Sequence, residues 1–553
     1  MTSLINSLFR TTSAITALLL LSTLGFAQAT TNNSDVVLKA MEDELQRSIS
    51  KLVIQGQEKP YFIEYEAMDV KSFTATAAFG GVVYAQRNQA RAMTVDVRVG
   101  NYEFDNEPRS YPISVAIEDD YNALRHELWL ATDAAYRGAV EQIARKRAFL
   151  KNRVDDEKIP DFSKEEATVL LLAPQTLTFD QKQWETTVRE LSALFRQYPV
   201  IKDSRVTLQT QLVQRYLVNS EGTRIRRPMI MISLEASAAA QTADGMWVNL
   251  ATPFYATSFE QLPSVAEMTK AIKQMAEQVT KLQAAPVIDE NYLGPVLFTG
   301  PASAEMFAQL LAPEFCSYRP PVGMQGEDRS ELANRLNRRV LPFHISVYDD
   351  PTQEKFGDKA LLGSYKVDDQ GVAARKISLV EQGVLKNLLL SRRPRKNMLR
   401  STGHGRSGLN GGASTEIGNL FIQSSDGKSY DQLKQELLKM CKALEMPYGI
   451  IVKGGSLNDP ALTYKVYVED GREELIRGVS MGELTVKQLK AQIIAVGNDS
   501  YVLNRAGGGS YGGGGVSTSV IAPSVLLEEL ELKKPTGAQQ KPMLLTHPYF
   551  DKP

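Results

Sequence analysis

The sequence predicts an α+β protein that consists of two large domains. Roughly 525 residues remain once the expected N-terminal signal is removed, and such a chain is too long for one hydrophobic core. Its first half mixes the spacing of amphipathic helices with the alternation of half-buried strands, whereas its second half is mainly strand-like. We expect an N-terminal domain over 30–285, a strand-rich C-terminal domain over 286–534 and a loosely ordered tail over 535–553.

The first residues have the pattern of a secretory signal peptide. Arg10 precedes an apolar run from Ala14 to Phe26 that is too short for a confident membrane span, and Ala27-Gln28-Ala29 has the small residues of a cleavage site. An uncleaved anchor is the alternative. We expect residues 1–29 to be removed and the protein to be exported across the inner membrane, into the periplasm if the source is a Gram-negative bacterium.

The first half contains both kinds of periodicity. Met93, Val95, Val97 and Val99 alternate with polar residues, as in a strand with one buried face. Other residues recur at spacings of three and four, as on one face of a helix. In chain order we expect a helix over 38–52, a strand over 93–99, a helix over 122–153, a helix over 184–195, and two strands over 206–218 and 225–236 joined by a turn at 219–222.

A connecting helix leads to the second half. Ser264 and Glu267 form a capping-box pattern, and an apolar stripe continues to Leu282. We expect this helix to pack against its own domain, with coiled-coil pairing as the alternative. Beyond Pro286, turns at 381–383 and 469–471 separate alternating runs, as in hairpins.

Charge and cysteine content exclude some classes of function. The 63 basic and 64 acidic residues give a net charge of -1, so neither nucleic acid nor an anionic membrane is favoured as a partner. The basic run 391–397 is interpreted as a charged surface turn. Two cysteines do not make a disulfide scaffold; whether Cys316 and Cys441 pair stays open, and Cys441 lies on an apolar helix face, as a buried thiol would.

The chain resembles the TldD/PmbA family of metallopeptidases in several segments that occur in the family's order. These segments are 300–313, 363–372, 379–387, 449–452, 495–499 and 521–527 in the second half, and 219–222 in the first. The resemblance implies two domains, an N-terminal one of helices and antiparallel sheet and a C-terminal, strand-rich, barrel-like one that carries a metal site.

The family's metal ligands are missing from this sequence. In the family, the helix that corresponds to 300–313 carries His-Glu-x-x-x-His, and a late loop adds a cysteine. Here the motif positions are Ala308, Gln309 and Pro313, which offer neither an imidazole nor a carboxylate, and 505–516 has no cysteine. His126-Glu127 does not replace the motif, because the residues four and five after His126 are leucine and alanine. We therefore predict no catalytic residue, no metal ligand and no cofactor; zinc is expected only if the protein is active.

Candidate contacts with a peptide come from two segments. The glycine-rich stretch 403–418 contains His404, Arg406 and Asn410, and it either borders a cleft or is a surface loop, the interpretation that we favour. Tyr318 and Arg319 lie where two prolines force an extended chain. We predict these five residues as substrate contacts.

The predicted function is binding without hydrolysis. Because the family includes paired subunits of which only one has the metal motif, the resemblance implies a heteromer with a motif-bearing homologue, or a homodimer, that binds peptides. The alternatives are an active metallopeptidase with a non-standard metal site and a structural protein of the cell envelope.

Overall fold

The computed structural model describes residues 35–535 apart from 108–111, 152–157, 323–329, 409–411, 458 and 508–514, together with 540, 541, 543, 545 and 547–550. The predicted signal peptide and Asn410 therefore lie outside the described residues. Residues from Asp35 onward form one compact unit. Among the described residues, no helix is both long enough and apolar enough to cross a membrane.

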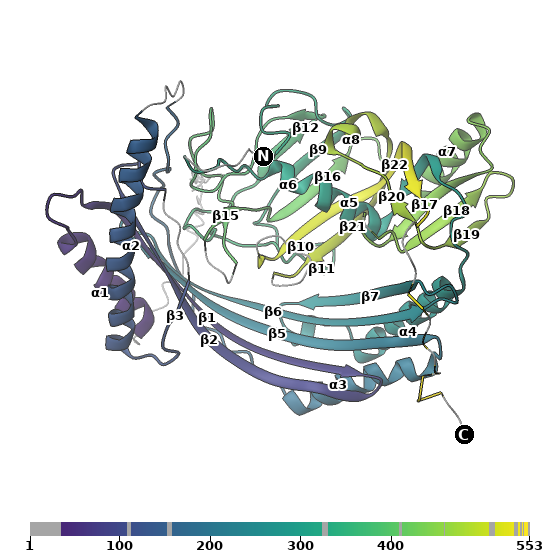
Figure 1. Cartoon of the computed structure of the whole chain (residues 1–553), viewed down its shortest axis with the longest axis horizontal. Coiled ribbons are helices and arrows are strands. Elements are labelled where there is room, and N and C mark those ends of the chain that lie inside the picture. Colours follow the sequence, from purple (N-terminus) through teal and green to yellow (C-terminus); the bar gives the residue numbers. More distant parts are fainter. Residues whose placement is uncertain are drawn as a thin grey trace, which may run out of the picture. The chain divides into compact units, whose positions relative to one another are not determined.

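The first half of this unit is a sheet of long strands with helices packed against it (Figure 1). In the described part, the strand order is β3-β2-β1-β5-β6-β4, with β7 paired to β6. Its elements are α1 (Val36–Lys51), β1 (Pro60–Ala78), β2 (Gly81–Val99), β3 (Ile113–Ser114), α2 (Tyr121–Leu150), β4 (Val169–Leu171), α3 (Gln181–Ala193), η1 (Leu194–Gln197), β5 (Ile201–Asn219), β6 (Arg224–Gln241), β7 (Trp247–Ala256), η2 (Phe259–Gln261) and α4 (Val265–Ala284).

Local sequence explains where these helices begin. The side chains of Asp35, Asp120 and Asp180 accept hydrogen bonds from the first turns of α1, α2 and α3, and Ser264 and Glu267 form the predicted capping box of α4. The apolar faces of α1 and α2 cover one part of the sheet, and those of α3 and α4 cover another. The connecting helix thus packs against its own domain, as predicted.

The second half is built on a mixed sheet. In the described part, its order is β13-β12-β9-β16-β22-β8-β17-β18-β19, with β20 and β21 also paired to β22. Its elements are β8 (Tyr292–Phe298), α5 (Gly300–Leu310), α6 (Ala312–Phe315), β9 (Ile345–Asp349), β10 (Lys355–Phe356), β11 (Lys359–Ala360), β12 (Ile377–Glu381), β13 (Val384–Leu385), β14 (Gly405–Arg406), β15 (Ser414–Thr415), β16 (Asn419–Ser424), α7 (Tyr430–Ala443), β17 (Tyr448–Gly454), β18 (Leu462–Tyr467), β19 (Glu473–Ile476), β20 (Ser480–Met481), α8 (Val486–Gln492), β21 (Ile493–Arg505) and β22 (Thr518–Lys533).

The α+β class and the two-part organisation are confirmed, with one correction to the C-terminal part. The second sheet is open rather than barrel-like, since β13 and β19 end its path without pairing to each other in the described residues. α4 ends at Ala284 and β8 begins at Tyr292, on either side of the expected boundary after residue 285. The domain limits themselves, including the tail, stay predictions.

Two expectations about surface segments are wrong. The run 391–397 is not simply a charged surface turn, because Arg392 is 1% exposed and bonds to the first half of the chain. Residues 403–408 of the glycine-rich stretch are not a surface loop either, since all of them, including His404 and Arg406, are buried, whereas Gly412 and Ser414 are exposed. In both cases a polar sequence is buried because it meets partners that are distant in the chain. Cys441 is buried, as predicted, and both cysteines are free.

Candidate functional site

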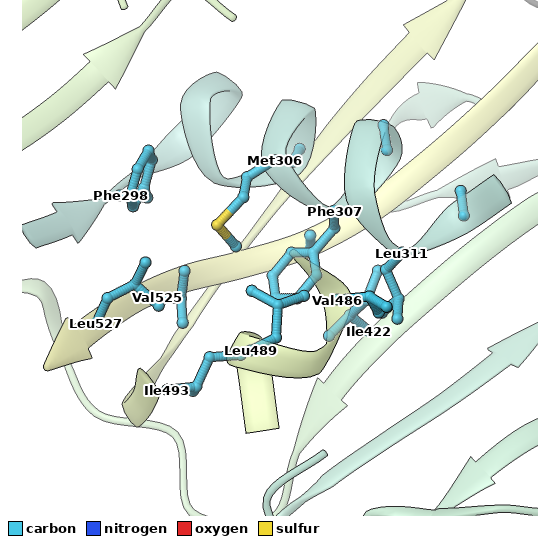
Figure 2. Packing of buried hydrophobic residues seen from close by; sticks show 14 of the residues in the cluster. Phe298, Met306, Phe307, Leu311, Ile422, Val486, Leu489, Ile493, Val525 and Leu527 are labelled. Carbon is cyan, nitrogen blue, oxygen red and sulfur yellow. The ribbon is translucent and has the colours of Figure 1, made fainter. Parts of the chain in front are cut away.

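The helix that holds two of the three predicted motif positions is packed against the hydrophobic core. α5 begins after Thr299 with proline in its first turn, and its buried residues are Ala302, Ser303, Ala304, Met306, Phe307 and Ala308. Figure 2 shows Phe307 and Leu311 among apolar side chains that include Val486, Leu489 and Ile422. Of the three motif positions, Ala308 belongs to this buried face, whereas Gln309 is half-buried and Pro313 is exposed.

The residues at the motif positions do not fit a metal ion. The Ala308 side chain is a methyl group in a residue that is 4% exposed. Gln309 Nε2 donates to Glu305 Oε1 at 2.6 Å, and Glu305 also pairs with Arg505 from β21 at 2.7 Å. Among the described residues, no three His, Cys, Asp or Glu side chains are grouped so that they could hold a metal ion.

The helical path is interrupted just before Pro313. α5 ends at Leu310, and Pro313 lies inside the short helix α6, where proline occupies the first turn. Proline lacks an N–H group, but the first turn of a helix does not need one. The proline therefore marks a break between two helices instead of ending the helical path.

His404 lies in the interior and has partners on both ring nitrogens. Its Nε2 is 2.9 Å from Asp349 Oδ1, and its Nδ1 is 3.1 Å from both the hydroxyl and the carbonyl oxygen of Thr402. The residue is 0% exposed. This geometry is that of a structural histidine, so we do not include His404 in the candidate site, and its predicted role as a ligand contact stays untested.

Arg406, two residues further along, lines a cavity of about 190 Å³ between the two halves of the chain. One wall consists of residues from β5 and β6, and the opposite wall comes from 362–369, 406–408 and 515–517. Arg215 and Arg227 are directly opposite each other on β5 and β6, and both line the cavity. Like charges that face each other across two strands repel, so this pair requires an anion nearby.

Two buried carboxylates partly balance these arginines. Arg215 Nη1 is 3.1 Å from Asp369 Oδ1 and donates to Glu66 Oε1 at 2.5 Å, and Arg227 also pairs with Asp369. Burial alone would raise the pKa of Asp369, but the three guanidinium groups of Arg215, Arg227 and Arg406 hold its pKa below the usual range. Asp369 is therefore ionised, and it anchors the C-terminal part to the first sheet.

The surroundings retain an excess of positive charge. Burial lowers the pKa of Arg227, Asp369 opposes this effect, and the neighbouring Arg215 and Arg406 add to the lowering. Burial also raises the pKa of Glu416 to about 7, against the effect of Arg406, so this carboxyl gives only part of a negative charge at neutral pH. The cavity can thus accept an anionic group.

Tyr318 and Arg319 lie near a different cluster of charges. Arg319 donates to the carbonyl oxygens of Ile159 and Pro160, at 3.2 and 2.9 Å, and pairs with Asp161 at 3.2 Å. Tyr318, which is 40% exposed, lines a smaller cavity of about 150 Å³. Tyr318 therefore lines a different cavity from Arg406, and the prediction that the five residues contact a substrate stays a prediction.

Sequence reasoning missed most of the cavity. The sequence alone does not indicate Arg215, Arg227 or Asp369, because each of them, taken by itself, resembles an ordinary charged residue on the surface. The one available signal was the charged pair Arg226-Arg227 inside an otherwise strand-like run. Only the pairing of β5 with β6 and the contact with 362–369 bring these side chains together.

Comparisons with known proteins agree with the architecture. Residues 291–534 match the PmbA/TldA metallopeptidase C-terminal domain. A metalloprotease of Archaeoglobus fulgidus is 31% identical over 167 residues, which are 29% of this chain and 36% of that protein. A metalloprotease of Methanothermobacter thermautotrophicus is 24% identical over 286 residues, 51% of this chain and 59% of that protein. The matched regions thus span less than two thirds of these curated relatives.

Solved structures show the same fold at low sequence identity. TldE from Thermococcus kodakarensis aligns with a TM-score of 0.58 and 15% identity, covering 89% of this chain and 100% of that one. A putative modulator of a DNA gyrase from Thermotoga maritima aligns with a TM-score of 0.56 and 17% identity, covering 85% and 96%. With the matched C-terminal domain and the curated relatives, these findings lead to one conclusion: the chain belongs to the TldD/PmbA family.

Proposed function

We propose that this protein is an exported, catalytically silent member of the family that binds extended peptides as a subunit of a proteolytic complex. The observation that carries the proposal is the set of residues at the predicted motif positions: Ala308 on the buried face of α5, Gln309 bonded to Glu305, and Pro313 in α6 offer no metal ligand. The N-terminal pattern of Arg10, an apolar run and Ala27-Gln28-Ala29 supports export.

An unpaired stretch of β6 supports peptide binding. On the side away from β5, β4 pairs with 224–226 and β7 pairs with 232–241, so 227–231 has no strand partner there among the described residues. An extended peptide can add to such an edge through main-chain hydrogen bonds. The cavity with Arg215 and Arg227 lies next to this gap.

An open edge of β2 supports the partner role. Beyond its pairing with β1, β2 pairs within the described residues only with β3, at Ala92 and Met93, and its residues 81–90 are all exposed. A long exposed edge strand is a template for pairing with another chain. A motif-bearing homologue or a second copy of this chain would cover it.

The proposal is tested by looking for metal, cleavage and binding in one preparation. The purified protein without its first 29 residues is exposed to zinc, desalted, subjected to elemental analysis and then incubated with a library of unstructured peptides. We expect no stoichiometric zinc, intact peptides by mass spectrometry and a retained subset of peptides after gel filtration. Cleavage products that disappear with a chelator would establish the active alternative and overturn the proposal.

A further inference from the structure

We propose that the cavity beside β6 is a carboxylate-binding subsite that holds the C-terminal residue of a peptide with an apolar side chain. This inference rests on the proposed peptide-binding function and names the part of the peptide that is recognised. Four observations carry it: the charge of the lining, the unused donors of its arginines, its size and apolar content, and its position at a gap in the sheet.

The lining has more positive than negative charge. Arg215, Arg227, Lys366 and Arg406 line the cavity, and Asp369 is the acidic residue on its wall. Glu66 forms an ion pair with Arg215 and offsets part of its positive charge. Arg215 and Arg227 are cross-strand neighbours, so their positive charges repel each other. Asp369 offsets only part of this repulsion, and a further anion in the cavity would offset more of it. A carboxylate is the anion that every peptide offers.

The hydrogen-bond donors of Arg406 have weak or missing partners among the described residues. The residue is 6% exposed, and its guanidinium stacks on the Tyr365 ring at 4.3 Å. Its Nη1 and Nη2 donate to the Ile417 and Ser517 carbonyl oxygens at 3.5 and 3.4 Å, the outer limit for such bonds. Its Nε has no hydrogen-bond partner among the described residues and is 3.6 Å from Asp369 Oδ2.

Arg227 shows the same deficit, because its buried Nε also has no hydrogen-bond partner in the described part of the chain. Buried charged donors are normally satisfied, and leaving one unsatisfied is costly. Guanidinium groups bind carboxylates through paired N–H donors, so two arginines that line one cavity and lack a full set of partners form a suitable receptor.

The size and chemistry of the cavity fit one residue. Its volume of about 190 Å³ is below the roughly 300–1,000 Å³ of pockets that hold drug-sized ligands. Val213, Met229, Leu362 and Val516 supply apolar wall. A carboxylate at the arginines would therefore place an apolar side chain of the same residue against hydrocarbon.

The gap in β6 gives the remainder of the peptide a place to lie. Leu172 N donates to Arg226 O, and Arg224 N donates to Thr168 O, so the backbone groups of these even-numbered residues point away from β5. The two-residue period of a strand then directs Pro228 O and both backbone groups of Ile230 outward. Proline at 228 fits an edge position, since no N–H is needed there.

The test compares two forms of one peptide. An unstructured peptide that ends in leucine and has fluorescein at its N-terminus is titrated with the protein as the free acid and as the C-terminal amide, by fluorescence anisotropy. We expect the amide to bind at least about tenfold more weakly, because it loses charge-assisted hydrogen bonds. A third peptide, an amide with glutamate before the leucine, should bind as weakly as the simple amide.

The outcomes separate the two proposals. If neither the acid nor the amide binds, the proposed peptide-binding function fails. If both bind equally, peptide binding stands and the carboxylate subsite is wrong. If the glutamate-containing amide binds as tightly as the free acid, a side-chain carboxylate suffices and the assignment to the C-terminal residue is overturned.

Two variants locate the effect in the cavity. Arg406→Gln should lower the affinity for the free acid at least about tenfold and leave the amide unchanged. Met229→Glu introduces a carboxylate at an exposed lining residue next to excess positive charge, so the fold is not threatened and the acid should bind more weakly. Leu444→Glu, at an exposed position outside the lining, is the matched control and should bind as the parent does. Equal affinity in all three variants would contradict the proposal.

Discussion

At the scale of single residues, this protein keeps several carboxyl groups in positions where ionisation is unfavourable. Glu64 is opposite Asp96 on β2 and opposite Asn219 on β5, whose amide donates to it at 3.2 Å. Burial raises the pKa of Glu64 from 4.5 to about 8, the nearby Arg392 opposes this shift and Asp96 adds to it. The Glu64 side chain is therefore protonated in the folded protein over a pH range in which it is ionised in the unfolded chain.

This shift predicts a pH-dependent effect of Glu64→Gln. Between pH 4.5 and 8, the unfolded chain ionises at this residue and the folded chain does not, so the free energy of unfolding falls as pH rises. Glutamine resembles the protonated side chain, so in the variant this residue no longer lowers the free energy of unfolding as pH rises. In urea titrations the variant should match the parent near the lower limit of this range and exceed it by a few kcal/mol above the upper limit. An equal difference at both limits would contradict the shifted pKa.

At the scale of elements, the sequence predicted what depends on neighbouring residues. The helices over 38–52, 122–153 and 184–195 match α1, α2 and α3 to within a few residues, because apolar spacing and capping side chains are local features. The order of the second sheet could not be predicted. It places β8 between β22 and β17, and such pairings join segments that are far apart in the chain.

The open edge of β2 leads to a prediction about assembly. Val115 N donates to Arg91 O, so the backbone of Arg91 points away from β1, and the two-residue period directs the N–H of Arg87 outward as well. Arg87→Pro removes that donor but keeps the hydrogen bonds to β1. We expect the variant to associate at least about tenfold more weakly with a second copy or with a motif-bearing homologue, as measured by light scattering after gel filtration.

The control for this edge is Arg87→Ala, which removes the side chain and keeps the backbone donor. It should associate as the parent does, and both variants should retain the parent's far-ultraviolet circular dichroism. Loss of association in both variants would assign the effect to the arginine side chain, and no loss in either would exclude this edge as the contact.

At the scale of the whole molecule, arginines from the second half hold the first half. Arg392 donates to Ser163 O through Nε at 3.1 Å and through Nη2 at 2.6 Å, pairs with Glu221 at 2.8 Å and lies 4.0 Å from the centre of the Phe162 ring. Neither this contact nor the arginine cavity was predictable, since each joins residues whose local sequence looks like solvent-exposed turn or strand. That 300–313 contains no His-Glu-x-x-x-His pattern was visible, because such a pattern is a local feature of the sequence.

The contacts that Arg392 makes with the first half predict how the two halves of the protein unfold. Breaking a buried ion pair by removing one partner costs about 3–5 kcal/mol, so Arg392→Ala should destabilise the protein by that order and weaken the coupling of its halves. All three tryptophans, Trp129, Trp184 and Trp247, lie in the first half, so their fluorescence reports that half, whereas circular dichroism reports both. In denaturant, the two signals should change together in the parent and separate in the variant.

Arg400→Ala is the control, because Arg400 is 60% exposed in its pair with Glu165 and should contribute under about 1 kcal/mol. Coincident transitions in Arg392→Ala would mean that other contacts suffice to couple the halves.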